Sequence, residues 1–359
     1  MEEIIYKLAL SSNTYIGPKR YNEIKNKIGI RDFFSLSPEE QVEFLNIRAD
    51  NAENVFKNML FEGEKIYKIC QKDGIKIIEI ESQFYPQNLK NIDDAPFLLY
   101  MAGEFNYSIK LLAVVGTREA TQEAIKINEY FVRELVDYGI GIVSGLARGH
   151  DGVAQKAALE RDGYTLAVLG GGVDVIYPKE NANLYKQIKQ KGCIISEYPP
   201  GVYPLKQNFP LRNRIISGLS DAVFVIQAPE KSGSLITAKY AEAQGREVYT
   251  IPGNVSDSMY TGTNRLIQNG VKVVISPEEI AMDLIGIREK KRNIASYVSL
   301  EDLTIEERKI LEELNREKHF DEIVSETKIS PPRLVHILTM LEIKGYIVEF
   351  PGNFYKQNI

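Results

Sequence analysis

The sequence predicts an α/β protein, with a Rossmann-like doubly wound parallel sheet, a helical N-terminal domain and a C-terminal winged helix. The first observation is that short runs rich in Val and Ile alternate with amphipathic segments from residue 111 to about 275. Such alternation is typical of a parallel sheet covered by helices on both faces. The second is that residues 1–65 show helical patterns and that three helices and a hairpin follow the alternating region.

The central domain is expected over residues 74–285. Residues 75–80 are strand-like, and residues 85–100 form an extended, proline-punctuated lead-in. The alternating strands are predicted at 111–115, 140–143, 165–169, 193–195, 222–226, 247–251 and 271–275. The helices are predicted at 123–138, 152–161, 183–191, 213–219, 234–244 and 264–269.

Two further domains flank the sheet. Residues 1–65 contain short helices, and a turn at Gly17-Pro18 makes a SAM-like or helix-hairpin-helix domain one interpretation and a plain helical bundle the other. The charged segment 286–299 is a predicted linker. Residues 300–359 predict a winged helix, with helices at 305–314, 320–326 and 331–343. The third helix has few cations, so either protein or DNA could be its partner.

Composition excludes several classes of function. The charge of −5 does not favour general polyanion binding, so a nucleic acid site would have to be local. The acidic N-terminus is unlike a signal peptide and no apolar run reaches the ~20 residues of a membrane helix, so a cytoplasmic protein that does not bind membranes is expected. The two cysteines and three histidines have no ligand spacing, so we expect no metal and no cofactor.

Small and polar residues follow almost every predicted strand. The loops lie at 116–118, 144–149, 170–172, 196–197, 232–234 and 252–254. Because the carboxyl ends of parallel strands share one edge, these loops should form a crevice of backbone amides suited to phosphate. Neither a P-loop nor a dinucleotide fingerprint is present. Instead, Arg118 places a cation in the first loop.

A local cluster of positive charge follows the fourth strand of the alternating series. Lys206, Arg212 and Arg214 flank Phe209, with no acidic residue between Tyr198 and Asp221. Cations can hold phosphates and a ring can stack on a base, as single-stranded nucleic acid requires. The alternative is an amphipathic helix. Its position suggests that Lys206 and Phe209 face the crevice, whereas Arg212 and Arg214 could equally bind phosphate or pair with loop carboxylates.

Together these motifs resemble the DprA/Smf family of DNA-processing proteins. The resemblance rests on GTR at 116–118, SGLARGHD at 144–151, GGGVDVIYP at 170–178 and FPLRNRIISGLS at 209–220, among others. It implies a homodimer that binds and protects single-stranded DNA and loads the RecA recombinase, with a single-stranded-DNA-binding protein as a further possible partner. His150 departs from the family, where an aliphatic residue is usual.

The resemblance also implies which residues bind DNA. Arg118 and Lys206 would hold phosphate, Phe209 would contact a base, and the loops at Gly116, Thr117, Ser144 and Gly145 would supply the amide cradle.

An enzyme is the main rival interpretation. Nucleotide-processing enzymes of related fold carry a PGGxGTxxE loop whose glutamate is catalytic. Tyr240 stands where that glutamate would be. Asp174 and Glu197 remain as acids, but carboxylates at strand ends more often hold loops by hydrogen bonds. We therefore expect no catalytic residue and no enzymatic activity.

Overall fold

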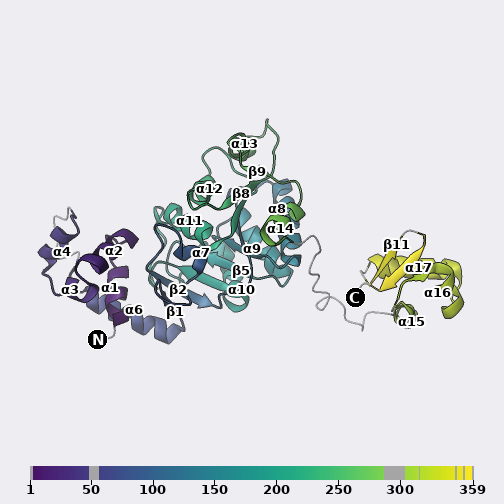
Figure 1. Ribbon diagram of the computed structural model, residues 1–359, viewed down its shortest axis with the longest axis horizontal. Coiled ribbons are helices and arrows are strands. Elements are labelled where there is room, and N and C mark those ends of the chain that lie inside the picture. The colour runs from purple at the N-terminus through teal and green to yellow at the C-terminus, as the bar shows by residue number, and fades with distance from the viewer. Residues whose placement is uncertain are drawn as a thin grey trace. The chain divides into compact units, whose positions relative to one another are not determined.

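The computed structural model describes residues 3–47, 56–286, 304–314, 316–343, 346–350 and 352–357. The chain forms two compact units, Met1–Lys291 and Arg292–Ile359, each described here by itself (Figure 1). Among the described residues, no helix is both long and apolar enough to cross a bilayer.

A nine-stranded sheet forms the centre of the first unit, in the order β1-β2-β6-β5-β4-β3-β7-β8-β9. Strands β3 to β9 are parallel, which confirms the predicted sheet. Its strands are β1 (Lys76–Glu79), β2 (Leu98–Gly103), β3 (Leu111–Val115), β4 (Gly141–Ser144), β5 (Thr165–Val168), β6 (Cys193–Ser196), β7 (Ala222–Val225), β8 (Glu247–Thr250) and β9 (Lys272–Val273).

Strands β1 and β2 extend this sheet in the antiparallel sense. β2 pairs with β6 through Met101 opposite Ile195, and β1 pairs with β2. The sequence predicted β1 but described the start of β2 only as part of an extended lead-in. Prolines next to a continuous apolar run occur both in isolated extended segments and in buried strands. Only the presence of a neighbouring strand, here β6, decides which of the two forms.

Helices cover both faces of the sheet (Figure 1). Side chains alternate along β3, so Leu112 and Val114 pack on one face and Ala113 and Val115 on the other. The first face carries α8 (Gln122–Asp137), α9 (His150–Glu160) and α14 (Pro277–Ile285); the second carries α7 (Gln87–Lys90), α11 (Asn208–Leu219) and α12 (Ser234–Ala243). Four further helical segments lie between β5 and β9: η1 (Lys179–Asn181), α10 (Ala182–Lys191), η2 (Ser258–Tyr260) and α13 (Thr261–Gln268).

The order of strands reverses at β3. From β3 the chain proceeds through β4 and β5 to β6, then returns to place β7 on the other side of β3. In open α/β sheets the loops at such a switch point diverge and leave a crevice at the carboxyl ends of the strands. This crevice lies between the loop after β3 and the loop after β7.

The N-terminal helices pack against the β1–β2 end of the sheet. They are α1 (Glu3–Ser11), α2 (Pro18–Lys27), α3 (Ile30–Phe33), α4 (Pro38–Phe44) and α6 (Met59–Asp73). The Ser11 and Tyr100 hydroxyl oxygens lie 2.7 Å apart, and the Tyr21 and Phe97 rings stack with their centres 4.1 Å apart. The predicted boundary at residue 65 falls inside α6, and this segment shares a buried core with the sheet.

The second unit is the predicted winged helix. Helices α15 (Ile305–Glu313), α16 (Phe320–Thr327) and α17 (Pro331–Ile343) pack against a sheet of β10 (Lys318–His319), β12 (Phe354–Gln357) and β11 (Ile347–Phe350). The sequence did not predict β10, which is only two residues long. In the predicted linker, Gly286 follows α14 in a left-handed conformation, and residues 287–299 lie outside the described residues.

Candidate nucleic-acid interface

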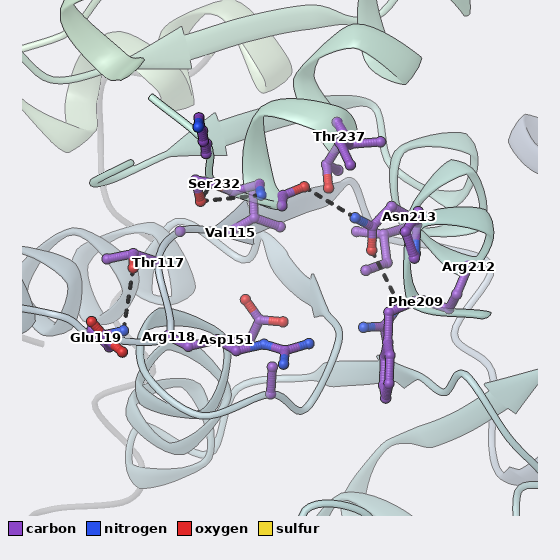
Figure 2. A pocket seen from close by; sticks show the side chains of 18 of the residues that line it. Val115, Thr117, Arg118, Glu119, Asp151, Phe209, Arg212, Asn213, Ser232 and Thr237 are labelled. Atoms are coloured by element: carbon purple, nitrogen blue, oxygen red, sulfur yellow. Dashed lines mark hydrogen bonds between the residues drawn. The ribbon is translucent and has the colours of Figure 1, made fainter. Parts of the chain in front are cut away.

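A pocket of about 530 Å³ lies at the switch point (Figure 2). One wall is the loop after β3, Gly116 to Glu119, and a second is the loop after β7, which includes Lys231 and Ser232. The third is the N-terminal part of α11 with Lys206 before it. Three segments far apart in the sequence therefore meet at the carboxyl edge, where parallel strands direct their loops.

Arg118 and Phe209 face each other in this pocket (Figure 2). The Arg118 guanidinium carbon lies 5.2 Å from the centre of the Phe209 ring, within the range of a cation–π interaction. Arg118 and Lys206 are exposed, whereas Phe209 is partly buried. The pocket therefore combines exposed positive charge with a partly buried aromatic ring.

The loop after β3 is held in place by the loop before α9. A Cβ on Gly116 would lie 2.5 Å from the His150 ring, and one on Gly149, whose φ is +73°, would lie 2.3 Å from the Thr117 carbonyl oxygen. Only glycine permits both approaches. The Thr117 amide donates to the Gln227 carbonyl at 2.8 Å. This predicted amide is thus used within the protein.

Two predicted residues of the amide cradle lie behind the pocket rather than in its wall. Ser144 is fully buried and its hydroxyl donates to the Val114 carbonyl at 2.6 Å. The Gly145 amide donates to the Asp151 carboxylate at 3.1 Å. The Ser144 hydroxyl and the Gly145 amide therefore already have internal acceptors, and neither residue lines the pocket as the predicted phosphate cradle requires.

Arg212 is an internal cation at the base of the pocket. Its guanidinium donates to the Gly145 carbonyl at 2.9 Å and to the Val168 carbonyl. Burial lowers the pKa of Arg212 to about 10, although the nearby Asp151 carboxylate opposes the shift. The group remains protonated at neutral pH. Arg212 therefore ties the ends of β4 and β5 together while adding positive charge to the pocket.

Arg214 lies outside this pocket. It forms a two-pronged pair with Glu197, at 2.8 and 2.7 Å, and contacts the Asp94 carboxylate at 3.1 Å. These carboxylates raise the pKa of Arg214 against the effect of burial. The sequence left two roles open for Arg214, a phosphate contact or a pair with loop carboxylates. The guanidinium is buried among carboxylates, so its inclusion among the DNA contacts is corrected to the second, structural role.

Sequence reasoning missed several residues of the pocket wall. Lys231 is exposed and adjoins the predicted loop at 232–234, so its charge next to that loop was the available signal. Asn213 links α11 to this loop by donating to the Gly233 carbonyl at 3.2 Å. Glu119 and Tyr177 also line the pocket. Tyr177 and Asn213 fall within the motifs at 170–178 and 209–220, but those motifs did not indicate that these side chains line the pocket, because their proximity depends on the packing of separate loops.

The carboxylates considered for catalysis hold structure together. Asp174 accepts hydrogen bonds from the Gly201 amide at 2.8 and 3.0 Å, and Glu197 pairs with Arg214. Within the described parts of the chain, no group of three His, Cys, Asp or Glu side chains could hold a metal ion.

The doubly wound sheet, with cations and an aromatic ring in a pocket at its switch point, defines the class of the protein as doubly wound α/β. The chain belongs to the DprA/Smf family of DNA-processing proteins. The family model for DNA recombination-mediator protein A matches residues 76–285, and the model for the DprA winged helix domain matches residues 295–353.

Relatives support this assignment over most of the chain. Protein Smf of Escherichia coli is 38% identical over 288 residues, which cover 78% of this chain and 77% of that protein. The DNA processing protein DprA of Streptococcus pneumoniae is 44% identical over 227 residues, covering 63% and 80%.

Solved structures agree with the fold. The X-ray structure of DprA from Streptococcus pneumoniae superposes with a TM-score of 0.68 at 33% identity and covers 79% of this chain and 99% of that one. DNA processing protein A from Helicobacter pylori, whose structure is described for its single-stranded DNA binding mode, superposes with a TM-score of 0.54 at 31% identity. That match covers 59% of this chain and 96% of the other.

Proposed function

We propose that this protein binds single-stranded DNA in the switch-point pocket and acts as a recombination mediator. The observation that carries the proposal is the convergence of Arg118, Lys206 and Lys231 on a pocket that contains Phe209. The chain as a whole has a charge of −5, so this concentration of cations is local. Family membership and the relative described as binding single strands support the same ligand.

The aromatic ring favours a single strand over a duplex. Every base has a π-face on which a side chain can stack, but in a duplex these faces are covered by neighbouring base pairs. The cations would hold the phosphates on either side of the stacked base. Such a site reads the backbone and any base, which suits a protein that handles strands of arbitrary sequence.

The test is a titration of the full-length protein with single- and double-stranded oligonucleotides of one sequence at two salt concentrations. We expect tighter binding of the single strand and a linear fall of log affinity with log salt. Equal affinity for both forms would contradict the proposal. Loss of all binding in the Arg118→Ala, Lys206→Ala double variant would assign it to the pocket.

We further propose, from the family, that the protein works as a homodimer that protects the strand and transfers it to a RecA-type recombinase. Sedimentation at several concentrations tests the dimer. Recombinase filament formation on DNA coated with single-stranded-DNA-binding protein tests the transfer, with the Arg118→Ala variant as a control for DNA dependence.

We infer that this activity is not enzymatic. Of the acids that line the pocket, Asp151 and Glu119, the buried Asp151 carboxylate accepts a hydrogen bond from the Gly145 amide and lies beside Arg212. Tyr240 stands at the position where related nucleotide-processing enzymes carry a catalytic glutamate. Incubation with nucleoside monophosphates and detection of free base is the check, and turnover would overturn this inference.

A further inference from the structure

A second aromatic ring lines the pocket. Of the described residues in the pocket wall, only Tyr177 and Phe209 are aromatic. Tyr177 belongs to the loop after β5, whereas Phe209 lies in the first turn of α11. Their ring centres are 5.6 Å apart and the planes are inclined by 37°.

Tyr177 has the more accessible ring of the two. Phe209 is partly buried, with the guanidinium carbons of Arg118 and Arg212 at 5.2 and 5.9 Å from its centre. It also packs over Gly170, where an added Cβ would lie 3.3 Å from the ring. Tyr177 is 42% exposed. Of the two aromatic residues that line the pocket, Tyr177 is therefore the more exposed.

Anchored residues on both sides hold Tyr177. Asp174 accepts from the Gly201 amide, and Asn181 donates to the Leu146 carbonyl at 2.9 Å and to the Ala147 carbonyl at 3.2 Å. A ring presented by a fixed loop loses little conformational freedom when a ligand binds.

The spacing of the two rings limits how a base can bind. Favourable contact between carbon atoms needs about 3.5 to 4 Å, so a base between two rings would require centres roughly 7 Å apart. At 5.6 Å the Tyr177 and Phe209 rings leave no such slot. A base must therefore lie on the outer face of Tyr177, beside the position served by Phe209.

We propose that Tyr177 is a second base-stacking residue of the site, which binds an unpaired base next to the one contacted by Phe209. This inference rests on the proposed binding of single-stranded DNA. It assigns the pocket two adjacent base contacts from different loops, with Arg118 and Lys206 available for the phosphates that join them.

The absence of tryptophan from the chain provides a direct reporter. The Tyr177→Trp variant would carry a single fluorophore at the proposed contact. Tyr130→Trp is the matched control, since Tyr130 is 52% exposed on α8 and does not line the pocket. We expect oligo(dT) to quench the fluorophore at position 177 and to leave that at 130 unchanged. An oligomer of equal length with abasic sites should quench neither.

Affinity measurements complete the test. Tyr177→Ala should weaken oligo(dT) binding roughly 5- to 150-fold, the range for losing one stacked base, and leave the salt slope unchanged. Tyr177→Phe should bind like the wild type. The difference between wild type and Tyr177→Ala should disappear on the abasic oligomer, which has phosphates but no bases.

The two levels of the proposal fail differently. If Tyr177→Ala binds oligo(dT) like the wild type while Arg118→Ala still weakens binding, Tyr177 is not a stacking residue and the proposed function stands. Equal quenching by the oligo(dT) and abasic strands would also overturn the inference. If the wild type shows no preference for single strands, both the function and this inference are wrong.

Discussion

The Arg118 guanidinium carbon lies 5.2 Å from the centre of the Phe209 ring, although β4, β5 and β6 separate the two residues along the chain. The contact places a cation beside the aromatic surface at the mouth of the switch-point pocket. A strand that stacks on the ring would bring a phosphate within reach of the cation. This pair therefore links the two interactions that single-stranded DNA requires.

The first prediction concerns Arg118. Arg118→Ala should weaken single-stranded DNA binding roughly 10-fold or more and reduce the magnitude of the salt slope by ~0.7, since one phosphate contact is lost. Arg133→Ala is the control, because Arg133 is a partly exposed arginine on α8 that pairs with Glu160 outside the pocket. Fluorescence anisotropy at several salt concentrations measures both quantities. Equal effects of the two substitutions would contradict the assignment.

The second prediction concerns Lys231, which no sequence motif identified. Lys231→Ala should also reduce the salt slope by ~0.7, because the residue is exposed in the pocket wall formed by the loop after β7. Lys239→Ala removes an exposed lysine from α12 that does not line the pocket, and it should leave the slope as it is. An unchanged slope in folded Lys231→Ala would exclude this lysine from the interface.

The third prediction separates Arg214 from the DNA contacts. Arg214→Ala should lower the free energy of unfolding by roughly 3 kcal/mol, because it leaves the largely buried Glu197 carboxylate without its cation. Arg161→Ala, which breaks the more exposed pair with Asp137, should cost about 1 kcal/mol or less. Urea unfolding measures both. A normal stability together with a reduced salt slope for Arg214→Ala would restore Arg214 to the DNA site.

The fourth prediction is a pH dependence of stability due to His150. Burial lowers the pKa of His150 from 6.5 to about 4, so between these values the unfolded state binds more protons than the folded state. The contribution of this residue to stability should therefore be present above pH 6.5 and fall as the pH is lowered towards 4, by about 3 kcal/mol in total.

The measurement is the difference between wild type and His150→Leu, because carboxylates titrate in the same range in both proteins. The wild type should lose more stability than the variant between pH 7 and pH 4, as followed by thermal or urea unfolding. Parallel stability curves would show that His150 is not held neutral by burial.

Most elements of the sheet were predictable because their pattern is local. The predicted strands at 111–115 and 222–226 correspond to β3 and β7 within a residue, since buried parallel strands are continuous apolar runs. The predicted helix at 213–219 is shorter than α11, which begins at Asn208. Pro210 and the cations obscured its first turn, although proline is tolerated there.

The site was only partly predictable. Arg118, Lys206 and Phe209 do lie in one pocket, as expected from loops at a shared sheet edge. Lys231 stood in no motif, and the motif at 170–178 gave Tyr177 no binding role, because a single exposed lysine or tyrosine is common on any surface. Ser144 and Gly145 looked like phosphate donors, and only the position of Asp151 and Val114 reveals that their polar groups are already paired.

Arg212 and Arg214 mark the limit between the two kinds of information. The sequence alone placed both in a cationic segment after a strand and left each with two possible roles.

Because successive helical residues are about 100° apart, residues two positions apart on α11 face in very different directions. Which direction meets the pocket depends on how α11 packs on the sheet and on where Glu197 lies. That packing directs Arg212 to the base of the pocket and Arg214 to the carboxylates of Glu197 and Asp94. Local pattern determined the elements and the charge, and tertiary packing decided which charge remains free for a ligand.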